Sequence, residues 1–329
     1  MYLTFLAFLF TNANAFTISN PHCDFIARVN GLNLNKKISR TDRNELKELF
    51  SEVPVLIFPK QSITPQRQFE VCQMFDEEFN EDIVHHYYNS NILSKPQLTL
   101  IGNGLVKKVF GISVNKKLNN IGAKFTKLWR QYINTYPDSL PPKIGSYYVL
   151  NNGNNKFGSW FVSMENAYDI LDDELKEKYE NMYVIYQNGN NLDKKIDFTG
   201  VSIPKKNIGN LKYDDNNFRM LPLVGYPEKN SIRKTLFFDP SNFHFFDYIN
   251  NQNFDQIDNH DECRKLMNNI LKLNSHKVLF DNDDLIIFNA RKVMLSHTPS
   301  KYTENLICMC ACFLGTYEQL FDINGDSFE

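Results

Sequence analysis

Residues 53–79 read VPVLIFPKQSITPQRQFEVCQMFDEEF, and this stretch decides the fold. Its first six residues form a compact apolar run that ends at Pro59, which is the pattern of a strand buried on both faces. Thr64 offers a side-chain oxygen to the free N–H groups of a first helical turn, and Pro65 at the first helical position loses no hydrogen bond. The stretch therefore predicts a strand, a turn and a helix that begins at Pro65.

The predicted helix is amphipathic. Apolar side chains recur on one of its sides, and these are Phe69, Cys72, Met74, Phe75 and Phe79. This stretch resembles the opening of the taurine dioxygenase family, the iron(II)- and 2-oxoglutarate-dependent oxygenases. The shared features, in order, are a strand, a turn, I-T-P, a helix, Phe and Asp/Glu.

Later segments are similar to this family in the same order. Pro141-Pro142, an apolar strand over 146–150, Trp160 and a helix around 166–168 come first. Residues 284–289 with Arg291 and His297, and an apolar strand that ends at 314–316, come last. The resemblance implies a mainly β protein with flanking helices over residues 16–316. Its expected fold is a distorted double-stranded β-helix, a jelly roll of two facing sheets.

The metal ligands that the resemblance implies are two His and one carboxylate, which leave positions open for 2-oxoglutarate and O2. In the family the first two arrive as H-x-D or H-x-E just upstream of the Pro-Pro segment, but this chain has no histidine between His86 and His244. Alignment on Trp129 puts Arg130 and Tyr132 at these positions, whereas alignment on Pro141-Pro142 puts Tyr132 and Asn134 there. We therefore expect Arg130, Tyr132 and Asn134 to mark degenerate ligand positions.

The distal ligand position and the cosubstrate arginine are the remaining family features. His297 is the candidate distal metal ligand, a vestigial one, although its spacing from Asn289 exceeds the family's N-x-R-x-x-H type pattern and requires an insertion. The family pairs 2-oxoglutarate with an arginine on the next strand, but residues 305–315 contain no Arg or Lys. Burying a charged cosubstrate without its cationic partner costs several kcal/mol. We expect no cofactor and assign no catalytic residue.

Ligands from elsewhere in the chain remain an alternative. His22-Cys23-Asp24 and His260-Asp261-Glu262 satisfy the three-residue pattern. The first lies before the first strand of the resemblance, and the second opens a helix over 263–273, where acidic residues suit the positive end of the helix dipole. An active dioxygenase with relocated ligands would use His297, iron(II) and 2-oxoglutarate.

A basic amphipathic segment replaces the family's ligand loop. Residues 114–136 carry apolar side chains at helical spacing with basic residues between them, among them Lys124, Lys127, Trp129 and Arg130. They predict a helix that either packs over the emptied pocket or binds a protein partner or a membrane surface.

Composition argues against a nucleic-acid-binding protein, and cysteine placement indicates core residues. The net charge of -2 with interspersed signs gives no basic stripe for nucleic acid, and 42% hydrophobic content suffices for one large core. Cys308, Cys310 and Cys312 alternate, so they share one face of a strand and are expected as small core residues. A bridge from one of them to Cys23, Cys72 or Cys263 is left open.

The two ends of the chain differ from its body. Residues 1–15 combine an apolar stretch too short to span a bilayer with Ala13-Asn14-Ala15, which predicts a signal peptide or hydrophobic leader. A buried N-terminal strand or an uncleaved anchor is the alternative. Residues 317–329 predict a polar, solvated tail.

The sequence thus predicts a catalytically degenerate jelly-roll protein that is secreted or lies in the lumen of the secretory route. It would serve there as a binding or structural component, with a protein partner or by self-assembly. The alternatives are the active dioxygenase above and a structural component of a large DNA virus particle.

Overall fold

A computed structural model of the chain describes residues 16–19, 23–76, 98–119, 129–131, 142–153, 157–187, 218–228, 230–240, 243–248, 259–298 and 307–314. Several predictions fall outside these residues: the leader over 1–15, the tail over 317–329, His22, Lys124, Lys127, Tyr132 and Asn134. Within the described part, no helix is long and apolar enough to cross a membrane.

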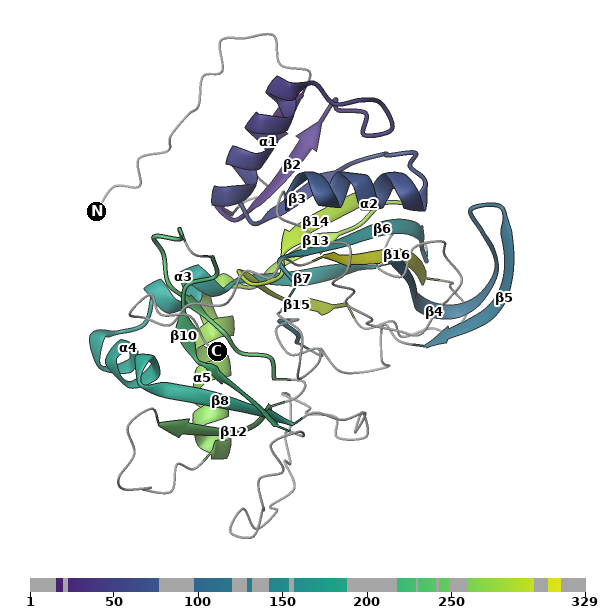
Figure 1. Ribbon diagram of the computed structural model, residues 1–329. Helices are drawn as coiled ribbons and strands as arrows, with labels where there is room; N and C mark the ends of the chain where they lie inside the picture. The colour runs from purple at the N-terminus through teal and green to yellow at the C-terminus, as the bar shows by residue number, and fades with distance from the viewer. Residues whose placement is uncertain are drawn as a thin grey trace.

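An eight-stranded sheet forms the centre of the molecule (Figure 1). Its neighbours pair antiparallel except β2 and β3, which are parallel. In sheet order the strands are β1 (Thr17–Ser19), β2 (Ile26–Asn30), β3 (Val55–Phe58), β14 (Leu285–Asn289), β6 (Ile144–Asn152), β16 (Ile307–Leu314), β4 (Leu98–Val109) and β5 (Ile112–Asn119).

A three-stranded sheet faces the large one and closes the jelly roll. It consists of β13 (His276–Leu279), β7 (Gly158–Ser163) and β15 (Val293–His297), all antiparallel. The space between the two sheets holds a core rich in aromatic side chains, to which β6, β7, β14 and β16 each contribute. Because successive residues of a strand point to opposite faces, only every second residue of these strands enters it.

Helices α1 (Arg40–Glu52) and α2 (Pro65–Met74) cover the other face of the large sheet (Figure 1). The Thr64 hydroxyl accepts from Arg67 N at 3.2 Å, and Pro65 begins α2. All four residues of β3 are buried, so the predicted strand, turn and helix are confirmed.

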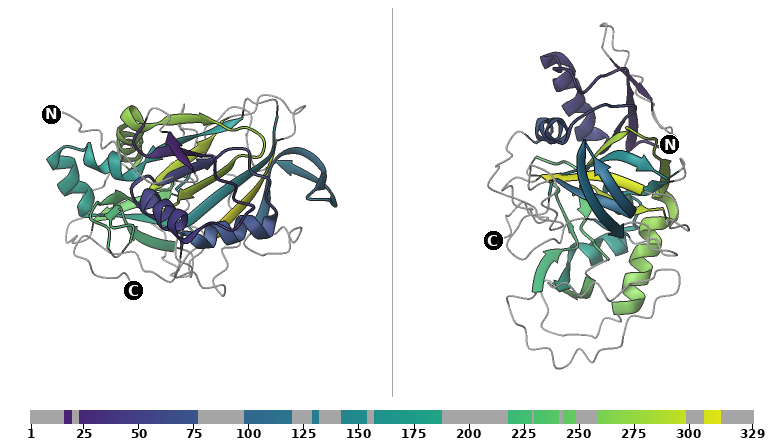
Figure 2. Two further views of the ribbon diagram at one scale, coloured as in Figure 1. Left: turned by 90° about the horizontal axis from the view of Figure 1, so that it is seen from above. Right: turned by 90° about the vertical axis from the view of Figure 1, so that its right-hand side faces the viewer.

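A further layer lies on the outer side of the three-stranded sheet (Figures 1 and 2). Its strands are β8 (Met182–Gln187), β9 (Phe218–Pro222), β10 (Val224–Gly225), β11 (Thr235–Leu236) and β12 (Phe243–Tyr248). Its helices are α3 (Met164–Asp169), α4 (Asp173–Glu180) and α5 (Asn259–Asn274). Asp261 and Glu262 lie in the first turn of α5, as predicted for acidic residues that open a helix.

The helix expected over 114–136 is wrong in its two described parts, residues 114–119 and 129–131. Residues up to Asn119 belong to β5, which pairs with β4 as a hairpin, and Arg130 forms an antiparallel bridge to Leu295 of β15. Val114, Lys116 and Leu118 fit a period of two as well as they fit helical spacing, and pairing with β4 decided between them. Trp129 is 3% exposed and packs into the core of the outer layer, so it is not presented to a partner.

Candidate functional site

The candidate site lies between the two facing sheets, at the end of β15. His297 shares the inward face of β15 with Val293 and Leu295, and it stands opposite Ser159 of β7. The Oγ of Ser159 and the Nδ1 of His297 are 2.8 Å apart and share a hydrogen bond. This contact joins residues 138 positions apart and fixes the orientation of the imidazole ring.

Aromatic rings surround His297. Its ring lies 5.6 Å from that of Phe157 in a stacked arrangement and 5.2 Å from that of Tyr147 edge-on. Burial lowers the pKa of His297 to about 3, and the positive charge of Arg130 adds to the shift. The imidazole is therefore neutral at physiological pH, which is the form that binds metals.

Arg130 lies on the segment that runs beside β15. Its backbone N–H donates to Leu295 O and its carbonyl accepts from Leu295 N, both at 2.8 Å. Gln131, fully buried, holds the next position: its Nε2 donates to Leu236 O and Arg291 O, while its Oε1 accepts from Phe238 N. Arg130, a predicted ligand position in the alignment on Trp129, thus lies next to the strand of His297, whereas Tyr132 and Asn134 lie outside the described residues.

The strand after His297 turns only apolar side chains toward the site. Met309, Ala311 and Phe313 of β16 point into the space between the sheets, and each is at least 98% buried. The ring of Phe313 lies 6.2 Å from that of Tyr147 and 6.3 Å from that of Phe288. The inward face of β16 therefore carries no charge.

The cysteines of β16 occupy its other face. Cys308, Cys310 and Cys312 pack with Cys72 of α2 in the core beneath the helices, which confirms their prediction as core residues. All six cysteines of the chain are free, so none of the bridges left open by the sequence forms here. Burial raises the pKa of Cys308 to about 12, so its thiol stays protonated.

The Asn289 and Arg291 of the resemblance hold the turn between β14 and β15. The Asn289 Oδ1 accepts from Arg291 N at 3.0 Å, and its Nδ2 donates to Glu228 at 3.0 Å. Arg291 is fully buried, and its guanidinium donates to Pro227 O. These two residues join the jelly roll to the outer layer rather than line the site.

Lys292 follows in the same turn and forms a buried ion pair. Its Nζ lies 3.1 Å from Glu165 Oε1 of α3, and it also donates to Ser51 O at the end of α1. Arg233 approaches the other oxygen of Glu165 at 3.5 Å.

The remaining predicted ligand groups are spread over the molecule. Asp24 accepts from Asn166 Nδ2, and Glu262 pairs with Lys178 at 2.6 Å. Within the residues that the structure describes, no three His, Cys, Asp or Glu side chains come together in a way that could hold a metal ion.

Sequence reasoning did not single out Ser159, Phe157 and Tyr147, which contact His297. The strand expected over 146–150 already placed Tyr147 and Val149 on one face, which was the available signal. No comparable local signal marks Ser159, because its partner lies on a distant strand.

Comparison with solved structures identifies the architecture. AAD-2 in complex with Mn(II) and N-oxalylglycine matches with a TM-score of 0.64 and 17% identity, over 92% of this chain and 98% of that one. A taurine dioxygenase from Burkholderia xenovorans matches with a TM-score of 0.67 and 10% identity, over 95% of both chains. The chain has the taurine dioxygenase fold.

The predicted fold class, a double-stranded β-helix with flanking helices, is therefore confirmed. At these identities the likeness extends to the taurine dioxygenase fold alone. No model of a protein family and no curated protein matches the sequence.

Proposed function

We propose that this chain is a catalytically degenerate protein with the taurine dioxygenase fold, which serves as a binding or structural component. The position of Arg130 carries the proposal. This cation pairs with the strand of His297, at the position where the resemblance expects the first metal ligand. A guanidinium cannot give up its proton to become a ligand, and its charge repels a divalent cation.

The apolar face of β16 supports the same proposal. 2-Oxoglutarate carries two carboxylates, and a buried carboxylate without a cation or hydrogen-bond donors loses more hydration energy than it recovers. Met309, Ala311 and Phe313 offer neither. The described residues therefore do not fit a bound iron and cosubstrate, although His297 keeps the neutral form of a metal ligand.

In this proposal His297 has a structural role. Its bond to Ser159 ties β15 to β7, and its contacts with Phe157 and Tyr147 join the small sheet to the large one. With the predicted leader over 1–15, the protein would act in the secretory route or outside the cell.

The experiment is an anaerobic titration of the protein with iron(II) and 2-oxoglutarate, followed by visible absorbance and by metal content after gel filtration. We expect no charge-transfer band, and the same trace of iron in wild type, His297→Ala and His276→Ala. His276 is the matched control because it is a histidine on a different strand, β13. Its ring likewise contacts an aromatic ring, that of Phe25. Far-ultraviolet circular dichroism confirms that each variant is folded.

A saturable band that is lost in His297→Ala but kept in His276→Ala would overturn the proposal. It would show that His297 is a ligand and that the chain binds iron(II) and 2-oxoglutarate with relocated partners. An active oxygenase of the same fold serves as the positive control for the band.

A further inference from the structure

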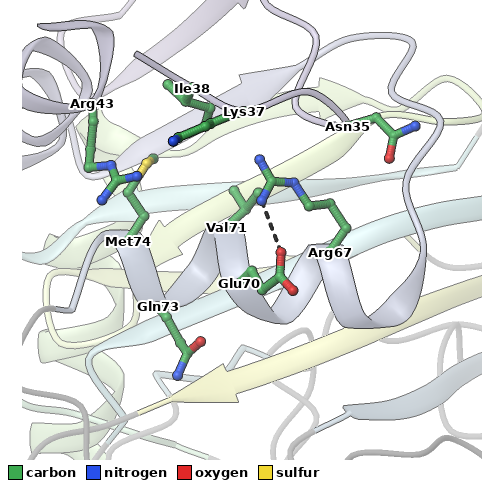
Figure 3. Close-up of a pocket in the computed structure, with 9 residues that line it drawn as sticks. All are labelled: Asn35, Lys37, Ile38, Arg43, Arg67, Glu70, Val71, Gln73 and Met74. Atoms are coloured by element: carbon green, nitrogen blue, oxygen red, sulfur yellow. Dashed lines mark hydrogen bonds and ion pairs between the residues drawn. The ribbon is translucent and has the colours of Figure 1, made fainter. Parts of the chain in front are cut away.

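Two grooves adjoin on the surface formed by residues 30–38, α1, α2 and the residues after β3. One has a volume of about 480 Å³ and lies between Lys37, Arg43 and α2 (Figure 3). The other has a volume of about 450 Å³ and lies along residues 30–35 and 59–62. Asn35 lines both. Each volume is in the range of small-molecule sites.

The first groove is cationic. Lys37, Arg43 and Arg67 line it, and Glu70 is its one acidic residue, so the lining has a net charge of +2. Arg67 is held in place by bonds to Glu70 at 2.9 Å and to Lys36 O at 2.6 Å. Its positive charge therefore has a fixed position at the rim, as Figure 3 shows.

Some cations in the described part of the chain are paired with a carboxylate, whereas Lys37 and Arg43 are among those that are not. Lys143, Lys234 and Arg264, for example, each lie within 3.0 Å of a carboxylate. For the exposed Lys37 and Arg43, no ion pair or side-chain hydrogen bond forms with any described residue. Two like charges that share a groove without an acidic partner repel each other, and an external anion would remove this repulsion.

The floor of the cationic groove is apolar. Val71 and Met74 of α2 and Ile38 are buried beneath the charged side chains. Such a floor favours an anion that carries an organic body over a bare inorganic ion.

The second groove is lined mainly by neutral polar groups, and Lys60 is its one charged residue. The Gln61 Oε1 accepts a hydrogen bond from Leu34 N, and its Nε2 donates to Leu32 O and Pro59 O. These bonds fix the wall of the groove. The side chains of Asn35 and Ser62 line the groove without a bond to any described residue. Amides and hydroxyls of this kind both donate and accept, which suits the hydroxyl groups of a sugar.

We propose that the two grooves together bind a sugar phosphate. The phosphate lies in the cationic groove among Lys37, Arg43 and Arg67, and the sugar extends past Asn35 toward Ser62. A phosphate monoester carries roughly -1.5 to -2 charges at pH 7, which matches the net charge of the groove. This site lies on the outer side of the large sheet from His297, so the proposal does not depend on whether the central site is degenerate.

Isothermal titration calorimetry at low ionic strength tests the proposal with three probes: glucose 6-phosphate, inorganic phosphate and glucose. We expect glucose 6-phosphate to bind about tenfold more tightly than inorganic phosphate, because only it reaches both grooves. Glucose alone should give no measurable heat. Equal affinities for glucose 6-phosphate and inorganic phosphate, or no binding of glucose 6-phosphate, would overturn the proposal.

Surface variants locate the site. Lys37→Gln/Arg43→Gln should weaken glucose 6-phosphate binding by about tenfold, since each exposed charge contact is worth up to about 1 kcal/mol. Asn35→Ala should weaken glucose 6-phosphate but leave inorganic phosphate unchanged. Lys107→Gln/Lys108→Gln, which removes the same charge from exposed positions of β4, is the matched control. Equal losses in the control and in Lys37→Gln/Arg43→Gln would show a general effect of charge and refute the assigned site.

Discussion

Replacing Lys292 with Met should destabilise the protein strongly, because it leaves Glu165 charged in a buried position. Glu165 is 4% exposed and Lys292 9%, and their charged atoms are 3.1 Å apart. Removal of one partner of a buried pair costs about 3–5 kcal/mol. Arg233 remains 3.5 Å from the other oxygen of Glu165 and compensates part of the loss. We therefore expect the free energy of unfolding to fall by about 3 kcal/mol, the lower end of that range.

Urea unfolding followed by circular dichroism measures this change, provided that the dependence on urea keeps the same slope. The double variant Glu165→Leu/Lys292→Met removes both charges and should recover to within about 1 kcal/mol of wild type. Arg264→Met breaks an exposed pair, with side chains 61% and 55% exposed, and should change stability by less than about 1 kcal/mol. If Lys292→Met were no worse than Arg264→Met, the reasoning about the buried pair would be refuted.

Two other changes give contrasting tests. In Gly158→Ala the new Cβ would lie 1.9 Å from Val278 O, within the pairing of β7 and β13, so we expect a loss of about 3 kcal/mol or more in urea unfolding. In Gly111→Ala the new Cβ would meet no atom within 4 Å, so the free energy of unfolding should fall only by the strain of the positive φ, about 1–2 kcal/mol. Equal losses in the two variants would contradict this explanation. The pKa of His297 is lowered from 6.5 to about 3, so the unfolded state binds the proton more readily, and wild-type stability should fall as pH falls from 6.5 toward 3. His297→Gln should show a weaker dependence in unfolding measured across this window, and a slope identical to that of wild type would refute a partly buried, neutral imidazole.

Local signals in the sequence were sufficient for much of the fold. The buried strand β3, the cap at Thr64 and the start of α2 at Pro65 all depend on residues within a few positions of one another. The alternation of cysteines in β16 likewise fixed which side chains share a face. Such features are set by sequence neighbours, so no knowledge of the rest of the fold is needed to predict them.

Features that depend on distant pairing could not be predicted in this way. The segment Ile112–Asn119 became a strand because β4 pairs with it, although its spacing also fits a helix. The Ser159–His297 bond and the Glu165–Lys292 pair each join residues more than a hundred positions apart. Their partners are identified only once the two sheets and α3 are placed together.

The order of strands in the large sheet constrains how copies of this chain could associate. An open sheet offers its outermost strands as templates on which another molecule can add a strand. Here the outermost described strands are β1, which has three residues, and β5, which carries Lys116 and Lys117. Short length and lysine charge both discourage such addition. Addition of a strand from a second copy to either described edge of the large sheet is therefore disfavoured.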